Sequence, residues 1–165
     1  MMSDFELNPR FEILNEKKFV GKNLKMSFAD NKTFELWREF MPRRNEIKNA
    51  VETKLYSIEI YDKAFFENFD PISLFEKLAA VEVTNFENIP QNFESLVAPK
   101  GLYAVFVYKG KSSGAAKFYQ NIFQNWLPNS EFSLDTRPHF AVMGEKYKND
   151  SDDSEEEVFI PVKTK

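Results

Sequence analysis

The stretch FELWREFMP, at residues 34–42, occurs a second time as QNIFQNWLP at residues 120–128, without a gap. Leu36 aligns with Ile122, Phe40 with Trp126 and Pro42 with Pro128. An internal repeat constrains the architecture of a chain more strongly than local patterns do. Because there are only two copies, the sequence predicts a duplicated domain and not a solenoid.

The length of 165 residues is typical of one domain with a sizeable core. We therefore expect a single domain over residues 1–165, with pseudosymmetric halves at about 11–85 and 93–163. Aromatic residues make up 16% of the chain, including 18 Phe. Aromatic rings fill cores, and they also line pockets for flat organic ligands, so composition leaves both uses open.

The charge balance argues against nonspecific binding to nucleic acid, because the net charge is −4 and the pI is about 5.2. The chain has no cysteine, which excludes disulfides and thiolate metal sites and is compatible with a reducing cytosol. No signal peptide is recognisable at the start, and no apolar run reaches the roughly 20 residues of a membrane span. The predicted location is the cytoplasm.

Both halves predict the order strand, helix, strand, strand. In the first half the strands are 11–28, 56–61 and 76–83, and a helix follows Asn31 and stops or bends at Pro42. A buried stripe is predicted at Phe34, Trp37, Phe40 and Met41. In the second half the strands are 93–109, 139–143 and 158–162, with a helix over about 112–128.

Alternation along the strands predicts two faces for the sheet. Residues 58–61 align with 140–143, and residues 79–83 align with 158–162. One parity is uniformly apolar and is predicted to carry the helices: Ile58, Ile60, Ala79, Val81, Val83, Phe140, Val142, Val158, Ile160 and Val162. The other parity mixes rings, acids and small residues, which favours a groove for an organic ligand over a solvated face: Glu59, Tyr61, Leu78, Ala80, Glu82, Ala141, Met143, Glu157, Phe159 and Pro161.

The chain resembles the GyrI-like domain over roughly residues 10–163. The similarity rests on the order and spacing of segments 35–47, 56–61, 79–83, 101–110 and 159–162. This domain is the effector-binding part of AraC-type and MerR-type transcription regulators and is also found alone. The resemblance implies an α+β fold of two strand–helix–strand–strand units. It further implies an antiparallel sheet with two helices on one face and a ligand groove near the pseudo-twofold axis on the other.

Members of that family commonly carry a groove acid in a Pro-x-Phe-Glu-x-Tyr pattern before the last strand. Here Ala141 replaces the acid and Met143 replaces the ring, while the aligned strand of the first half has Glu59 and Tyr61. We therefore predict that Glu59, with Glu157, supplies the negative charge that attracts a lipophilic cation.

The predicted ligand-binding residues combine the mixed face with the two indoles: Glu59, Tyr61, Leu78, Ala80, Trp37, Trp126, Ala141, Met143, Glu157 and Phe159. Both tryptophans also fit the core. His139 lacks a local base or nucleophile, so no catalytic residue is predicted. The acidic run at 150–157 lacks the spacing of a calcium loop, and glycines are too few for a phosphate-binding loop. No metal or cofactor is predicted.

Three functions remain open at this point. The leading one is a stand-alone small-molecule-binding protein that does not bind DNA itself, because the duplicated domain leaves no room for a helix-turn-helix. The resemblance also covers hydrolases of electrophilic small molecules, in which Glu59 could act as a general base. The third is a protein-interaction module whose acidic surface faces a basic partner.

Overall fold

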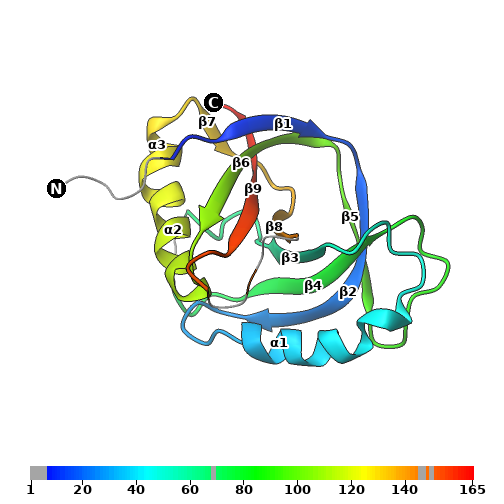
Figure 1. Ribbon diagram of the computed structural model, residues 1–165. Coiled ribbons are helices and arrows are strands. Elements are labelled where there is room, and N and C mark those ends of the chain that lie inside the picture. The colour runs from blue at the N-terminus through cyan, green and yellow to red at the C-terminus, as the bar shows by residue number, and fades with distance from the viewer. Residues whose placement is uncertain (1–6, 68–69, 145–147, 149–150) are drawn as a thin grey trace.

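A computed structural model describes residues 7–67, 70–144, 148 and 151–165 (Figure 1). Its centre is one strongly curved antiparallel sheet with the strand order β1-β6-β9-β8-β3-β4-β2-β5, and a short strand β7 that pairs with β9. The strands are β1 (Arg10–Leu14), β2 (Lys17–Met26), β3 (Leu55–Ile60), β4 (Phe75–Val83), β5 (Glu94–Ala98), β6 (Gly101–Lys109), β7 (Phe132–Leu134), β8 (His139–Met143) and β9 (Glu155–Thr164).

The helices lie outside the curve of the sheet (Figure 1). Helix α1 (Thr33–Phe40) begins where Asn31 Oδ1 accepts a hydrogen bond from the backbone N–H of Thr33 at 2.9 Å. It continues as a 3-10 helix (Met41–Glu46) with Pro42 near its start. The α-helix thus ends beside Pro42, where the sequence predicts that it stops or bends. A 3-10 turn (Ser112–Gly114), α2 (Ala115–Asn121), a π-helical turn (Ile122–Trp126) and α3 (Leu127–Asn129) follow one another in the second half.

The strand order shows the duplication directly. Strands β3 and β8 pair at the centre, and moving outward one meets β4 and β9, then β2 and β6, then β5 and β1. Each half therefore repeats strand, helix, strand, strand about the β3–β8 pair. The two aligned helix residues Leu36 and Ile122 are both fully buried. The predicted α+β class and the duplication are confirmed.

Three apolar cores are arranged around the sheet. The interior core lies on the concave face, where Tyr56, Phe140 and Phe159 pack together across the halves. The α1 core joins Leu36 and Phe40 to β2 and β4, and the α2 core joins Phe118 and Ile122 to β6 and β9. The central strands are therefore buried on both faces.

The predicted assignment of faces is correct for β4 and β9 but wrong for β3 and β8. Ile58 pairs directly with Leu78 and with Phe140, and Phe140 pairs with Phe159. Directly paired residues share a face, so Ile58, Ile60, Phe140 and Val142 lie on the concave side and not beneath the helices. Alternation reveals that two faces exist, but only the pairing register shows which one each residue joins.

The buried stripe of α1 also differs from the prediction. Phe34 is 76% exposed and Met41 is 43% exposed, whereas Leu36 and Phe40 are buried and Trp37 packs beside them. The α-helix ends at Phe40, and the tighter 3-10 helix that follows turns Met41 away from the sheet. Within the described part of the chain, no helix has the length and apolar character needed to cross a membrane.

Truncating either aligned helix residue should destabilise the fold by a similar amount. For Leu36→Ala and for Ile122→Ala we expect a loss of about 2–5 kcal/mol, because each change opens a cavity in a packed core. Phe34→Ala, on the exposed side of α1, should change the free energy of unfolding by less than about 0.5 kcal/mol. Urea denaturation measures all three, and a large loss in only one half would contradict equivalent roles for the two helices.

Candidate ligand site between the two helices

The central strands β3 and β8 lie between the regions that α1 and α2 cover. Helix α1 contacts β2 and β4, and α2 packs on β6 and β9. The outward side chains of β3 and β8 therefore lie near the pseudo-twofold axis, on the same face as the helices. Here Glu59 pairs with His139 on one side and with Lys77 of β4 on the other. We call Glu59, Tyr61, Lys77, Tyr119, His139 and Glu156 the axial cluster.

Glu59 is the acid at the centre of this cluster. The residue is only 9% exposed, and its Oε2 lies 3.3 Å from Ser57 Oγ and 3.6 Å from Lys77 Nζ. Burial raises the pKa of Glu59, while the charge of Lys77 and the Ser57 hydroxyl oppose that rise. A carboxylate that is withdrawn from water in this way is strongly stabilised by a nearby cation.

Glu156 supplies a second carboxyl group from β9. Burial is the main cause that raises the pKa of Glu156 to about 7, and the negative charge of Glu59 adds to it. The charge of Lys77 opposes this shift. Burial also raises the pKa of Tyr119 and of Tyr61, and in both cases the charge of Glu59 adds to the effect. Besides His139, the axial cluster thus combines two acids, one lysine and two phenols that remain protonated.

Aromatic rings from both halves pack over this cluster. The ring of His139 meets Tyr61 edge-on at 4.9 Å and lies 6.2 Å from Phe66 and 5.9 Å from Phe123. Phe66 and Phe123 stack on each other at 4.9 Å. Phe66 follows β3, whereas Phe123 lies in the π-helical turn after α2. These ring contacts join the two halves above the axis.

His139 is held neutral at this place. It is 5% exposed, and burial, helped by the charge of Arg137, lowers the pKa of His139 to about 3. Among the described residues, its Nδ1 has no hydrogen-bond partner. A buried polar atom without a partner is rare in proteins, and a bound ligand or water can satisfy it.

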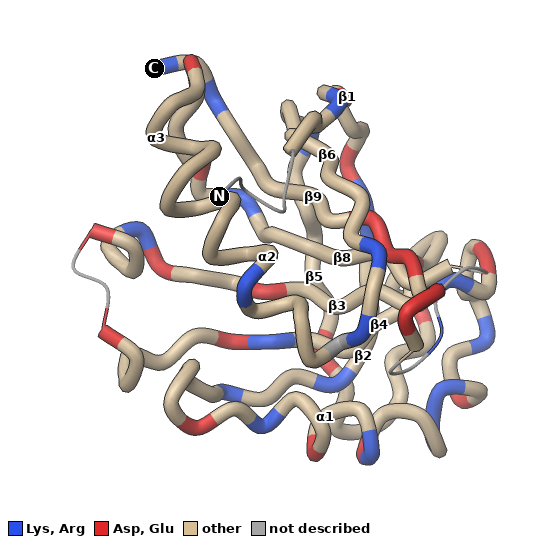
Figure 2. Tube along the Cα trace, turned by 60° about the vertical axis from the view of Figure 1, so that its left-hand side comes forward, with Lys and Arg blue, Asp and Glu red and all other residues tan. Residues whose placement is uncertain are grey.

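Figure 2 shows the surroundings of the cluster from the side: α1 lies below, α2 and α3 lie above, and the segment that follows β3 extends between them. That segment contacts the first half through the backbone hydrogen bond from Ala29 to Pro71, and the second half through the Phe66–Phe123 stack. The described residues of this segment therefore link the two halves beside the axial cluster.

The structure separates nine of the ten predicted site residues into three groups. Glu59, Tyr61, Ala141 and Met143 lie on the helix-bearing face, near the axis. Leu78, Ala80 and Phe159 belong to the interior core, so these three do not lie beside Glu59. Trp37 packs in the α1 core, and Trp126 packs in the α2 core.

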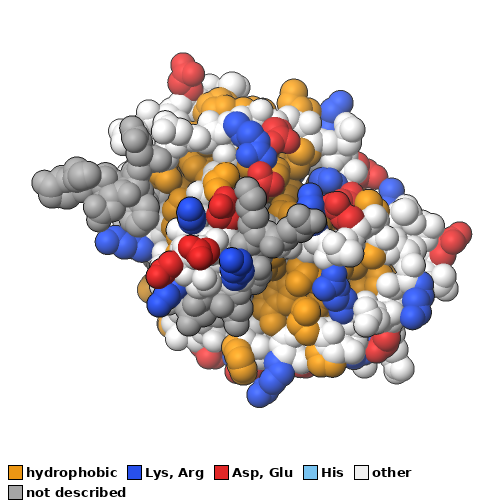
Figure 3. Space-filling view, viewed as in Figure 1, with side chains coloured by type: hydrophobic (Ala, Val, Ile, Leu, Met, Phe, Trp, Pro, Cys, Tyr) orange, Lys and Arg blue, Asp and Glu red, His pale blue; other side chains and the backbone are white. Residues whose placement is uncertain are grey.

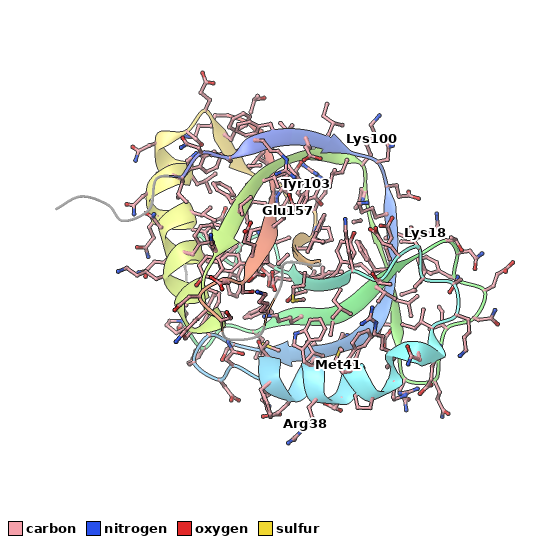
Figure 4. The ribbon with its side chains drawn as sticks, viewed as in Figure 1. Lys18, Arg38, Met41, Lys100, Tyr103 and Glu157 are labelled. Atoms are coloured by element: carbon pink, nitrogen blue, oxygen red, sulfur yellow. The ribbon has the colours of Figure 1, made fainter. Side chains whose placement is uncertain are left out.

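Glu157 lies on the concave side, within the curve of the sheet, where it pairs with Val142 of the interior core (Figure 4). Its Oε2 is 2.6 Å from Arg10, and its side chain is 40% exposed. The neighbouring acid, Glu156, faces the helices instead. Alternation with Val158 and Ile160 could have indicated this, because those residues share its parity and belong to the α2 core. Lys77 and Tyr119 carried no signal in sequence.

Two other surfaces differ from the axial cluster. A depression of about 290 Å³ is lined by Arg44, Asn45, Ile47, Ala50, Glu52, Thr53 and Val81. Its lining contains no aromatic ring, and none of the axial residues. Figure 3 shows acidic and basic side chains interspersed with apolar surface on the face seen there. Within the described ranges, no group of three His, Asp or Glu side chains is placed to hold a metal ion.

A duplicated α+β domain with buried acids and rings at its axis has the features of a domain that binds organic molecules. The GyrI-like small molecule binding domain matches residues 7–163, so the chain belongs to that family. A search of curated proteins finds no match.

Solved structures show the same fold. SAV2435 bound to tetraphenylphosphonium is similar with a TM-score of 0.72 and 14% identity, over 94% of each chain. The C-terminal domain of EcmrR gives a TM-score of 0.71 and 16% identity, over 98% of this chain and 100% of that one. A hydrolase encoded by lin2189 from Listeria innocua gives a TM-score of 0.56 and 10% identity, over 94% and 91%.

His139 and Glu156 should give stability opposite dependences on pH. The pKa of His139 falls from 6.5 to about 3, so the unfolded chain binds the extra proton and stability rises with pH between these values. The pKa of Glu156 rises from 4.5 to about 7, so the folded chain binds the extra proton and stability falls as pH rises between these values. Each slope is at most about 1.4 kcal/mol per pH unit.

Urea denaturation from pH 5 to pH 6.5 separates the two slopes. Glu156→Gln leaves the histidine effect, so stability should rise with pH more steeply than in the wild type. His139→Phe leaves the carboxyl effect, so stability should fall with pH. If both variants keep the wild-type slope, neither group is perturbed as described.

Proposed function

We propose that this domain binds lipophilic organic cations at the axial cluster. The observation that carries the proposal is the burial of Glu59, whose Oε2 contacts only Ser57 and Lys77 among the interactions described. A charge pair in such a poorly solvated site is several times stronger than the same pair in water. An organic cation also leaves water more readily than a strongly hydrated ion does, so burial favours it.

The rings around Glu59 support a flat or multiply aromatic ligand. Tyr61, Phe66 and Phe123 provide aromatic edges and faces from both halves. A cation over an aromatic face gains about 0.5–2 kcal/mol, which adds to the pairing with a carboxylate. SAV2435, which has the same fold, is bound to tetraphenylphosphonium, a cation of this class. Entry of a ligand would part the Phe66–Phe123 stack.

We infer a role as a ligand sensor of the effector-binding type. The structural match with an EcmrR chain solved in a complex with DNA covers 96% of this chain and 58% of that one. This chain therefore corresponds to part of that regulator. Its acidic pI of about 5.2 supports a small molecule, rather than nucleic acid, as the direct partner. The lack of cysteine supports a cytoplasmic location. A protein partner would receive the signal.

A hydrolase is the second candidate, favoured by Glu156. A carboxyl group with a pKa of about 7 can act as a general acid or base at neutral pH, and Tyr119 interacts electrostatically with it. A protein of the same fold from Listeria innocua is described as a hydrolase. Incubation with electrophilic small molecules distinguishes the candidates, because turnover beyond one equivalent excludes simple binding.

Removing the buried charge should weaken cation binding selectively. We expect Glu59→Gln to reduce the affinity for tetraphenylphosphonium at least tenfold in isothermal titration calorimetry. The neutral analogue triphenylphosphine oxide should lose less than twofold, because it does not use the charge. Glu157→Gln is the matched control, since Glu157 lies on the concave side. Equal affinity of wild type and Glu59→Gln for the cation would refute the proposal.

Cation affinity should also depend on pH through Glu156. Because the pKa of Glu156 is about 7, its charge is present above that pH and is lost as pH falls through it. We expect the affinity for tetraphenylphosphonium to increase several-fold between pH 6 and pH 8 in the wild type. The increase should shrink in Glu156→Gln. An equal increase in both proteins would show that Glu156 does not contribute.

A further inference from the structure

We propose that Lys77 is an internal counter-ion that competes with cationic ligands for Glu59 and thereby sets the affinity of the site. The proposal rests on the binding function proposed above and adds the residue that limits it. Lys77 lies on β4, directly opposite Glu59 on β3. Its ammonium group is 3.6 Å from Glu59 Oε2, so it occupies a place beside that oxygen that a ligand cation would use.

The lysine is held in place from two sides. Its Nζ donates a hydrogen bond to Thr33 Oγ1 at 3.1 Å, and its side chain is only 16% exposed. Thr33 is the first residue of α1, so the lysine bridges the helix and the central strand. The lysine nitrogen is closer to the threonine than to the carboxylate. The ammonium group therefore keeps one partner if a ligand takes its place beside Glu59.

The two halves differ at this pair of positions. Ile58 and Phe140 are aligned, and their partners Leu78 and Phe159 are therefore equivalent. By the same pairing, the Glu59–Lys77 pair corresponds to Ala141–Val158. Where one half has an acid with a lysine opposite it, the other half has two apolar residues. The lysine thus accompanies the acid and is not a general feature of these strands.

The charges of the cluster show what the lysine does to a ligand. Titratable and polar groups that face Glu59 come from every neighbouring element: Ser57, Tyr61, Lys77, Tyr119, His139 and Glu156. With His139 and both phenols neutral, ionised Glu59 and Glu156 carry two negative charges and Lys77 carries one positive charge. A monovalent cation therefore meets one net negative charge, and it would meet two without Lys77.

Calorimetry with tetraphenylphosphonium at pH 8.5, where Glu156 is ionised, tests the competition. We expect Lys77→Gln to bind this cation at least tenfold more tightly than the wild type. Lys77→Arg keeps the positive charge and should stay within about threefold of the wild type. Lys25→Gln is the matched control, because it removes an exposed lysine from the neighbouring strand β2 and should leave the affinity unchanged. Equal or weaker binding by Lys77→Gln overturns the proposal.

A second measurement does not depend on any ligand. Carbon NMR of the Glu59 carboxyl group should show a higher pKa in Lys77→Gln than in the wild type, and an unchanged pKa in Lys25→Gln. If the pKa rises but neither the wild type nor Lys77→Gln binds tetraphenylphosphonium, the proposed function fails and the ion pair stands. If the wild type binds but the pKa does not rise, the counter-ion proposal fails and the proposed function stands.

Discussion

The pairing register of the two central strands is the constraint on which the site depends. Ile58 and Phe140 face each other on the concave side, so Glu59 and His139 face each other on the helix-bearing side. A slip of one residue would exchange the two sets, burying the carboxylate among the rings of the interior core. The interior core prevents such a slip, because Tyr56, Phe140 and Phe159 pack against one another there. The apolar side of the sheet thus positions the charged side.

Burial of Glu59 has a free-energy cost that its neighbours only partly offset. A buried carboxylate needs a charge partner or several hydrogen bonds to remain ionised. Here Lys77 and Ser57 provide two contacts, both to the same oxygen, at 3.6 and 3.3 Å. Such distances are long for charge-assisted hydrogen bonds, which usually measure about 2.7–2.9 Å. Within the described part of the chain the carboxylate is therefore held by long contacts, which leaves free energy for a ligand to gain.

Most of the architecture could be predicted from the sequence. The repeat of residues 34–42 at 120–128 established the duplication, and Pro42 correctly indicated the end of α1. Strand β7 was missed, since three residues carry too short a pattern, and the segment 11–28 proved to be two strands. The predicted faces of β3 and β8 were reversed, because both sides of a central strand are apolar enough to resemble a core-facing side.

Contacts between distant parts of the chain could not be predicted from the sequence. Glu59 and Tyr61 were predicted because they keep a pattern that the second half has lost at Ala141 and Met143. Lys77 was not, because an isolated lysine in a strand usually faces water. The role proposed for Lys77 comes from its place opposite Glu59, which depends on the β3–β4 register. Sequence alignment of 79–83 with 158–162 also misplaced β9 by two residues relative to β4, as the equivalence of Leu78 and Phe159 shows.

Loss of symmetry at the axis explains why one half can act as the charged half. In a perfectly duplicated site, two copies of Glu59 would lie on the adjacent strands β3 and β8, and their repulsion in a poorly solvated region would favour protonation of one of them. With Ala141 at the second position, the remaining acid keeps its charge more easily, and Ala141 occupies less space than a glutamate. Glu156 then contributes a second carboxyl group from β9, with a pKa of about 7. The cluster can therefore carry one or two negative charges near neutral pH, and its lysine decides how much of that charge a ligand encounters.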